Sequence, residues 1–120
     1  MEIRISDFIK QIKTTKDTVR LYEELDLMRP VWINGTRDYT DKDQNDFYAI
    51  KEMQSMGLSL KDIQAIFEIK RNDGCGSEQL IEGVLNSLNC ELKLISEAEE
   101  ELNKKRLLIQ GLVKDLEELG

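Results

Sequence analysis

The sequence predicts a mainly α-helical fold, in which a head of short helices with one small β-hairpin precedes a single long C-terminal helix. Three observations support this prediction. Short apolar stripes at helical spacing follow Ser and Thr residues, Asn34-Gly35 separates two short extended runs, and from Ile81 onwards apolar residues recur in alternating steps of three and four. With 120 residues, the chain can form one compact core and one appended element.

Two short helices are predicted at the start of the chain. Ser6 can cap the first, and Thr15 can cap a second helix whose apolar stripe comprises Val19, Tyr22 and Leu25. Two short helices joined by a tight turn form a helix-turn-helix.

A β-hairpin is predicted directly after this pair. Pro30 prevents the helix from continuing, and residues 31–33 favour a strand. Asn34-Gly35 suits the left-handed backbone of a two-residue hairpin turn, and Arg37 and Tyr39 follow on the return strand. A hairpin in this place is a wing, so the head is predicted to be a winged helix-turn-helix.

Two further helices complete the head. Thr40 or Asp41 can cap a third helix, and Gly57 is expected to end it. Ser59 can cap a fourth helix, whose residues 60–69 carry apolar side chains at helical spacing. The predicted winged helix-turn-helix head therefore covers residues 1–71.

The rest of the chain is predicted to be a short linker, residues 72–76, and one long helix, residues 77–120. Its apolar stripe, called the seam below, comprises residues 81, 84, 88, 91, 95, 98, 102, 105, 109, 112, 116 and 119. Only Glu91 and Lys105 interrupt the seam, which is typical of a coiled coil. A helix about 60 Å long cannot be covered by so small a head, so we expect a homodimer.

The net charge of −7 at first argues against nucleic acid, but its distribution does not. Residues 1–71 contain 12 Lys/Arg and 13 Asp/Glu, whereas residues 72–120 contain 5 and 11. Lys10, Lys13, Lys16 and Arg20 gather in one segment that contains only Asp17 as an acid, so this is where DNA would bind.

Composition also excludes several classes of protein. The sequence has neither a membrane-spanning run nor a secretory signal, so we expect a soluble cytoplasmic protein. It has no His, no activated nucleophile and no phosphate-cradling loop, so we expect no enzyme activity and no cofactor.

Residues 14–30, TTKDTVRLYEELDLMRP, resemble the recognition helix of the mercury-resistance-regulator (MerR) family of bacterial transcription factors. The resemblance continues through the hairpin to the GLSLKDI helix start. Leu21, Asp26 and Thr36 depart from the pattern, replacing an aromatic residue, a turn glycine and the wing aromatic. Asp tolerates left-handed backbone, so Asp26 need not break the turn.

The resemblance implies a DNA-contacting set on the recognition helix, the wing and the start of the fourth helix. That set comprises Thr15, Lys16, Thr18, Arg20, Tyr22, Arg37, Tyr39 and Lys61. It further implies a dimer with antiparallel long helices, which binds a pseudo-palindromic promoter site, distorts it and acts with RNA polymerase. Deforming the duplex costs several kcal/mol, which extra backbone contacts offset.

The sequence says less about whether the protein binds an effector. Metal-sensing relatives use further cysteines that this sequence lacks, so we predict no metal site, whereas Cys75, flanked by glycines, is a candidate thiol sensor or simply a loop residue. Cys90 on the long helix is expected to be ordinary packing. Drug-binding relatives add a ligand domain after the coiled coil; this sequence, ending at Gly120, either lacks one or belongs to a longer protein.

Two alternative functions remain open. An architectural, chromosome-organising DNA-binding protein would use the same head with weak sequence selectivity. A coiled-coil adaptor would use the head to bind proteins, as the net negative charge suggests, and would tolerate neutralisation of Arg20 and Arg37.

Overall fold

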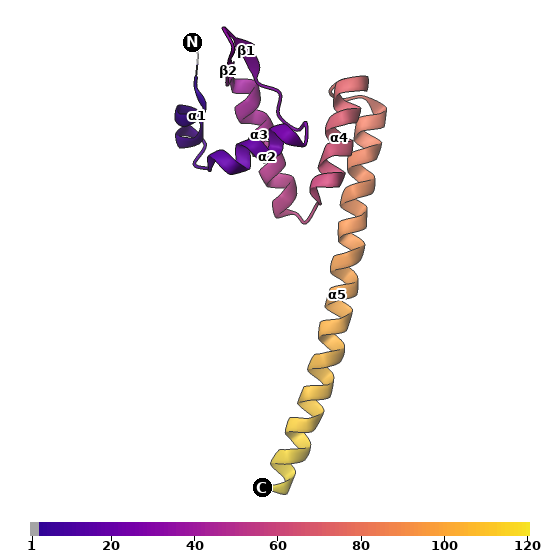
Figure 1. Cartoon of the computed structure of the whole chain (residues 1–120). Coiled ribbons are helices and arrows are strands. Elements are labelled where there is room, and N and C mark those ends of the chain that lie inside the picture. The colour runs from indigo at the N-terminus through magenta and orange to yellow at the C-terminus, as the bar shows by residue number, and fades with distance from the viewer. Residues whose placement is uncertain (1–2) are drawn as a thin grey trace. The chain divides into compact units, whose positions relative to one another are not determined.

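The computed structural model describes residues 3–120 and confirms the mainly helical prediction (Figure 1). A two-stranded hairpin is the sheet of this described part. The elements in order are α1 (Ile5–Gln11), α2 (Lys16–Glu24), β1 (Val31–Ile33), β2 (Thr36–Asp38), α3 (Asp41–Ser55), α4 (Leu60–Asp73) and α5 (Glu78–Leu119).

Three of the predicted helix caps are confirmed. The hydroxyl oxygen of Thr15 accepts a hydrogen bond from the backbone N–H of Thr18, and that of Ser59 accepts one from Asp62. At the start of α3, Thr40 is the cap. Its backbone N–H donates to the Asp43 carboxylate, in a reciprocal capping box.

The predicted cap at Ser6 is wrong. Helix α1 begins at Ile5, and Arg4 occupies the cap position without a side-chain capping bond. The reason is a tertiary contact: the N–H of Ile3 donates to the Asp38 carboxylate, and the N–H of Tyr39 donates to the carbonyl of Ile3. These bonds fix the extended segment before α1, so the helix begins before Ser6.

The hairpin forms with the predicted turn. Asn34 and Gly35 both have positive φ, 51° and 78°, as a tight two-residue turn requires. The strands pair antiparallel, with Trp32 opposite Arg37 and Ile33 opposite Thr36. Tyr39 lies just beyond β2, where its side chain turns into the protein.

The core lies among α1–α4 and the base of the hairpin. Aromatic rings join its parts: Phe8 of α1 stacks on Tyr39 at 4.5 Å between centroids, and Tyr22 of α2 meets Phe47 of α3 at 5.8 Å. The remaining buried apolar side chains are Ile12, Val19, Leu27, Met28, Ile50, Leu58, Ile63, Ile66 and Phe67.

The chain divides into two compact units, the first of which ends at Val84. The first turns of α5 thus belong with the helices before it; a Cβ at Gly83 would lie 3.1 Å from Cδ1 of Ile69 on α4. Helix α5 has no buried residue. No helix within residues 3–120 is long and apolar enough to cross a membrane.

Asp26 closes the C-terminus of α2 in left-handed backbone, at φ 61°. Its N–H donates to the carbonyl of Glu23 and that of Leu27 to the carbonyl of Tyr22, at 3.0 and 2.8 Å, which is a Schellman motif. The prediction that Asp can take the place of a glycine in this turn is confirmed.

The effect of a substitution at Asp26 should therefore depend on how readily the new residue adopts a positive φ. We expect Asp26→Gly and Asp26→Asn to stay close to wild type, and Asp26→Val to lose about 1–2 kcal/mol in free energy of unfolding, measured with urea. Asn removes the carboxylate charge but keeps the tolerance for positive φ. If Asn proved as damaging as Val, the ion pairs of Asp26 rather than its backbone would dominate.

Candidate nucleic-acid interface

Two predicted contact residues of helix α2, Lys16 and Arg20, are four residues apart and so lie on the same side of the helix. Lys16 is exposed and Thr18 half-buried in the first turn, and Arg20 follows one turn later with 34% of its side chain exposed. The hydroxyls of Thr15 and Thr18 lie 2.9 Å apart, so the capping residue also orients Thr18. The two side chains thus present a pair of hydroxyls at the start of α2.

Glu23 connects this side of α2 to the wing. One of its carboxylate oxygens lies 3.5 Å from Nη1 of Arg20, and the other lies 3.0 Å from Nε of Arg37 on β2. The hydroxyl of Tyr39 donates to the same carboxylate at 2.9 Å. Only 9% of the Glu23 side chain is exposed, so this one acid holds two arginines from different elements at a partly buried site.

Sequence reasoning assigned no role to Glu23. Its negative charge could have drawn attention to it, because a carboxylate on a helix expected to face phosphates is unfavourable unless it binds a neighbouring cation. The i,i+3 spacing of Arg20 and Glu23 could have indicated one such partner. Arg37 and Tyr39 could not be assigned to it without the fold.

Arg37 is held from a second direction by the wing itself. Its guanidinium carbon lies 4.5 Å from the centroid of the Trp32 ring, its partner across the hairpin. Arg4 donates to the hydroxyl of Thr36 on the same strand. Arg4, Arg20 and Arg37 line one shallow hollow, together with Ile5, Trp32, Gly35, Thr36 and Tyr39.

Two residues of the predicted contact set lie in the core instead. Tyr22 and Tyr39 are 1% and 0% exposed, and their hydroxyls donate to Gln54 at 2.7 Å and to Glu23. Because aromatic rings at helical and strand spacing gain most from burial, both pack inward rather than towards a ligand. We therefore correct the sequence-based expectation and leave both out of the proposed contact set.

The buried Tyr39 hydroxyl should make the fold sensitive to high pH. Burial, with the Glu23 carboxylate, raises the pKa of Tyr39 above its ordinary value of 10.0. The folded state then holds this proton more tightly than the unfolded state, so stability is retained below pH 10 and falls as pH rises above it. Thermal unfolding between pH 8 and 11 should show a steeper loss for wild type than for Tyr39→Phe. Equal slopes would contradict this assignment.

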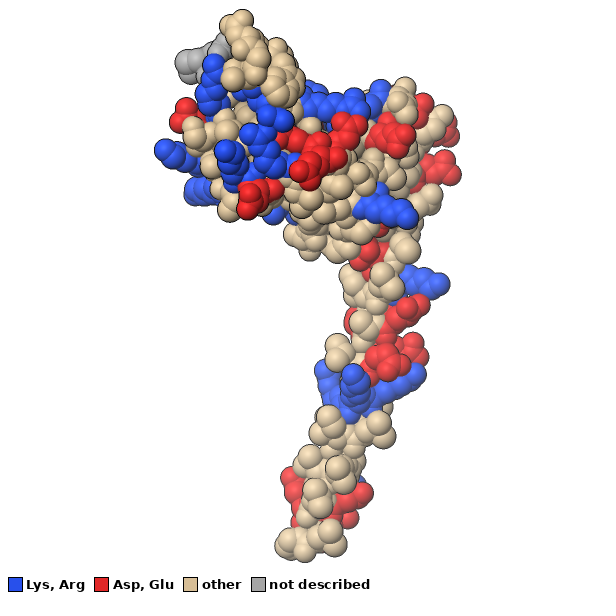
Figure 2. Space-filling view, viewed as in Figure 1, with Lys and Arg blue, Asp and Glu red and all other residues tan. Residues whose placement is uncertain are grey.

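The formal charge balance understates how basic this surface is. Asp38, Asp43 and Asp46 are buried; they accept from the N–H of Ile3, from Thr40 and from Lys42, respectively. By contrast, Lys10, Lys13 and Lys16 are exposed. Figure 2 shows Lys and Arg side chains gathered over α1 and α2, with acids fewer there. Lys61 is also exposed, in the first turn of α4.

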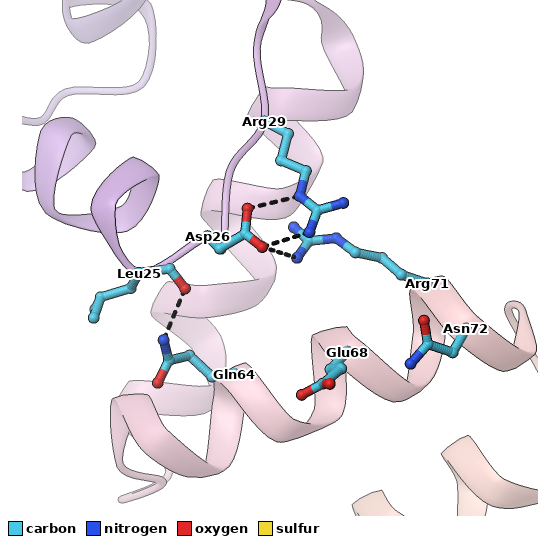
Figure 3. A pocket seen from close by; sticks show the side chains of 7 residues that line it. All are labelled: Leu25, Asp26, Arg29, Gln64, Glu68, Arg71 and Asn72. Atoms are coloured by element: carbon cyan, nitrogen blue, oxygen red, sulfur yellow. Dashed lines mark hydrogen bonds and ion pairs between the residues drawn. The ribbon is translucent and has the colours of Figure 1, made fainter.

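A second hollow lies between the end of α2 and α4 (Figure 3). Asp26 accepts from Nε of Arg29 at 2.7 Å and lies 3.6 Å from Nη1 of Arg71, while Gln64 donates to the carbonyl of Leu25 at 2.8 Å. The bond from Arg29 lowers the pKa of Asp26. The polar groups named here bind one another, and the bonds of Gln64 and Arg71 join α4 to the end of α2.

Both cysteines are free and exposed. Cys75 lies in the loop before α5, as predicted, whereas Cys90 is exposed on α5 and is not packed within this chain. Within residues 3–120, no three His, Cys, Asp or Glu side chains are grouped so that they could hold a metal ion. The sensor role of Cys75 stays a prediction.

Comparisons with known proteins agree with this geometry. The model of the MerR HTH family regulatory proteins matches residues 3–69, more than half of the chain. A crystal structure of HiNmlR, described as a MerR family regulator lacking the sensor domain and bound to promoter DNA, is similar with a TM-score of 0.60. It is 23% identical, and the match covers 92% of this chain and 91% of that one, which shows a shared fold. A search of curated proteins found no match.

The family match confirms the resemblance inferred from residues 14–30, and it falls on the segment that holds α1, α2, the hairpin and α3. It also places the chain among regulators rather than enzymes. The chain therefore belongs to the MerR helix-turn-helix family of DNA-binding transcription regulators.

Proposed function

We propose that this protein binds promoter DNA as a homodimer, with α2 in the major groove and the wing against the flanking backbone. The observation that carries the proposal is the Glu23 cluster, which holds Arg20 of α2 and Arg37 of β2 on one side of the head. Two guanidinium groups fixed in this way are suited to a base edge and a neighbouring phosphate. Lys16, Thr18 and Lys61 extend the same contact set.

The exposed apolar side chains of α5 support the homodimer. Leu102, Ile109, Leu112 and Leu116 of the seam are each between 58% and 62% exposed in the single chain. A contiguous apolar stripe of this length on a soluble helix indicates a covering partner helix. The head, residues 1–71, then acts as the DNA-binding domain and residues 77–120 as the dimerisation helix.

Such a dimer would bind a pseudo-palindromic site, with one head on each half. We further propose that it distorts the promoter and acts with RNA polymerase there. The described binding of HiNmlR, a protein of the same fold, to promoter DNA is consistent with this mode. Location in the cytoplasm, with the DNA, follows from the proposal.

Salt-dependent binding of the full chain to the promoter upstream of its own gene tests this function. We expect Arg20→Ala with Arg37→Ala to weaken binding about 100-fold or more, because each guanidinium contact contributes about 1–3 kcal/mol. The salt slope should also fall, by about 0.9 for each phosphate contact that is lost. Lys93→Ala with Lys114→Ala removes the same two positive charges from exposed positions of α5, so it is the charge-matched control and should bind like wild type.

The alternatives predict different results. An architectural protein would bind promoter and random duplex alike, whereas an adaptor would bind neither. Wild-type binding no tighter to the promoter than to random DNA at moderate salt would reject the regulator.

A further inference from the structure

Trp32, the only tryptophan of the chain, lies in the wing with 59% of its side chain exposed. Exposure alone says little, because single apolar side chains are common on protein surfaces. A tryptophan nevertheless gains more than most side chains when a partner covers it, since the ring is large and carries an N–H donor at its edge. The surroundings of the ring therefore decide whether it has a function.

The surroundings of Trp32 are positively charged. It lines the same shallow hollow as Arg4, Arg20 and Arg37, which come from the start of α1, from α2 and from β2. The guanidinium carbon of Arg37 lies 4.5 Å from the centroid of the indole ring, so Arg37 covers part of one ring face. The rest of the ring is open beside these cations. A ligand that suits this surface carries both negative charge and apolar surface, and the phosphates and deoxyriboses of a DNA strand supply the two in alternation.

The hairpin determines which residues share a face with Trp32. Trp32 is paired with Arg37 across the two strands, and side chains paired in this way lie on the same face. Arg37 in turn binds Glu23 of α2, so this is the face of the wing that meets the recognition helix. Val31 precedes Trp32 in β1 and points to the other face, because side chains alternate along a strand. The wing thus presents Trp32 and Arg37 together, on the side where α2 carries Arg20.

We propose that Trp32 contacts DNA directly, with its indole packed against the deoxyriboses of the strand whose phosphates Arg37 contacts. This inference rests on the proposed function and adds a residue that is absent from the contact set implied by the family resemblance. The hairpin holds both side chains in place before binding, so little side-chain freedom is lost. The two contacts differ in kind: a phosphate contact releases counterions and weakens with salt, whereas an apolar contact does not.

The fluorescence of Trp32 reports on this contact alone, because the chain has no second tryptophan. The full chain is titrated with the promoter duplex, and quenching by acrylamide, a neutral quencher, is measured with and without DNA. We expect the quenching constant to fall about 2-fold or more in the complex, because the sugars cover the ring. An unchanged constant in a complex that forms would leave the ring in solvent and overturn the inference. A constant that is already low without DNA would place Trp32 in a contact between protein chains and overturn it too.

A double-mutant cycle separates a direct contact from an effect that acts through Arg37. Trp32→Ala should weaken promoter binding about 10-fold. In an Arg37→Ala background, Trp32→Ala should still weaken binding about 5-fold and should leave the salt slope unchanged, because the contact that it removes is apolar. If Trp32→Ala had no effect in that background, Trp32 would only position Arg37 and would not itself be a contact.

Val31→Ala is the matched control. Val31 lies in the same strand and is exposed to a similar degree, 53%, but it is not among the residues that line the hollow. We expect it to bind the promoter like wild type, and circular dichroism should show that both variants keep their helices. If Val31→Ala weakened binding as much as Trp32→Ala, the loss would come from the hairpin as a whole and the inference would fail. A chain that binds no promoter DNA removes the proposed function as well, whereas promoter binding with Trp32 still in solvent rejects this inference alone.

Discussion

Replacing Glu23 with Ala is expected to lower the free energy of unfolding by about 2–4 kcal/mol. The substitution leaves the hydroxyl of the fully buried Tyr39 without its acceptor and removes the carboxylate that Arg20 and Arg37 share. Both arginines then lose their fixed orientation. We therefore also expect a smaller ratio of promoter binding to random-duplex binding, even though the head gains positive charge.

Glu24→Ala is the matched control, because Glu24 is the next residue of α2 and is exposed. It changes the net charge equally and touches none of the cluster. Urea unfolding and binding to both duplexes should separate the two variants clearly. If they behaved alike, the effect would be one of charge alone and Glu23 would have no positioning role. Glu23→Gln, which keeps an acceptor for Tyr39, should be less destabilised than Glu23→Ala.

Leu102→Asp is expected to weaken the dimer about 100-fold or more. In a homodimer the change places two carboxylates in the apolar interface, and burying an unpaired charge costs several kcal/mol. Affinity for a two-half-site promoter should fall with it, because a single head holds only one half-site. Sedimentation across a concentration series measures the first effect, and DNA binding at fixed protein concentration measures the second.

The chain offers a close control in Leu107→Asp. Leu102 and Leu107 are exposed to the same degree in the single chain, 61% and 60%, but Leu107 lies outside the seam on the opposite side of α5. The two variants therefore differ in the face that they change. Leu107→Asp should stay dimeric. If both variants weakened the dimer equally, either the interface would lie elsewhere or the substitutions would act by destabilising α5 itself.

Several features of this protein followed from the sequence because they depend on residues close together in the chain. The caps at Thr15 and Ser59 need only an N–H three residues ahead, and the Asn34-Gly35 turn needs only its own backbone. Family membership likewise rested on a contiguous run, residues 14–30, which lies within the matched segment.

The candidate interface was only partly predictable. Lys16, Thr18, Arg20, Arg37 and Lys61 lie outside the core, where DNA can reach them. Tyr22 and Tyr39 do not, since a tyrosine on a periodic stripe can face either a ligand or the core, and the spacing is the same in both cases.

The sequence by itself determined the order of the elements, the wing turn and the seam of α5, because each depends on interactions over a few residues. Only the tertiary structure decided the start of α1 and the partners of Glu23. The Ile3–Asp38 bond spans 35 residues and the Tyr39–Glu23 bond spans 16. Such pairs form when packing brings distant segments together, and burial then makes the hydrogen bond between them necessary.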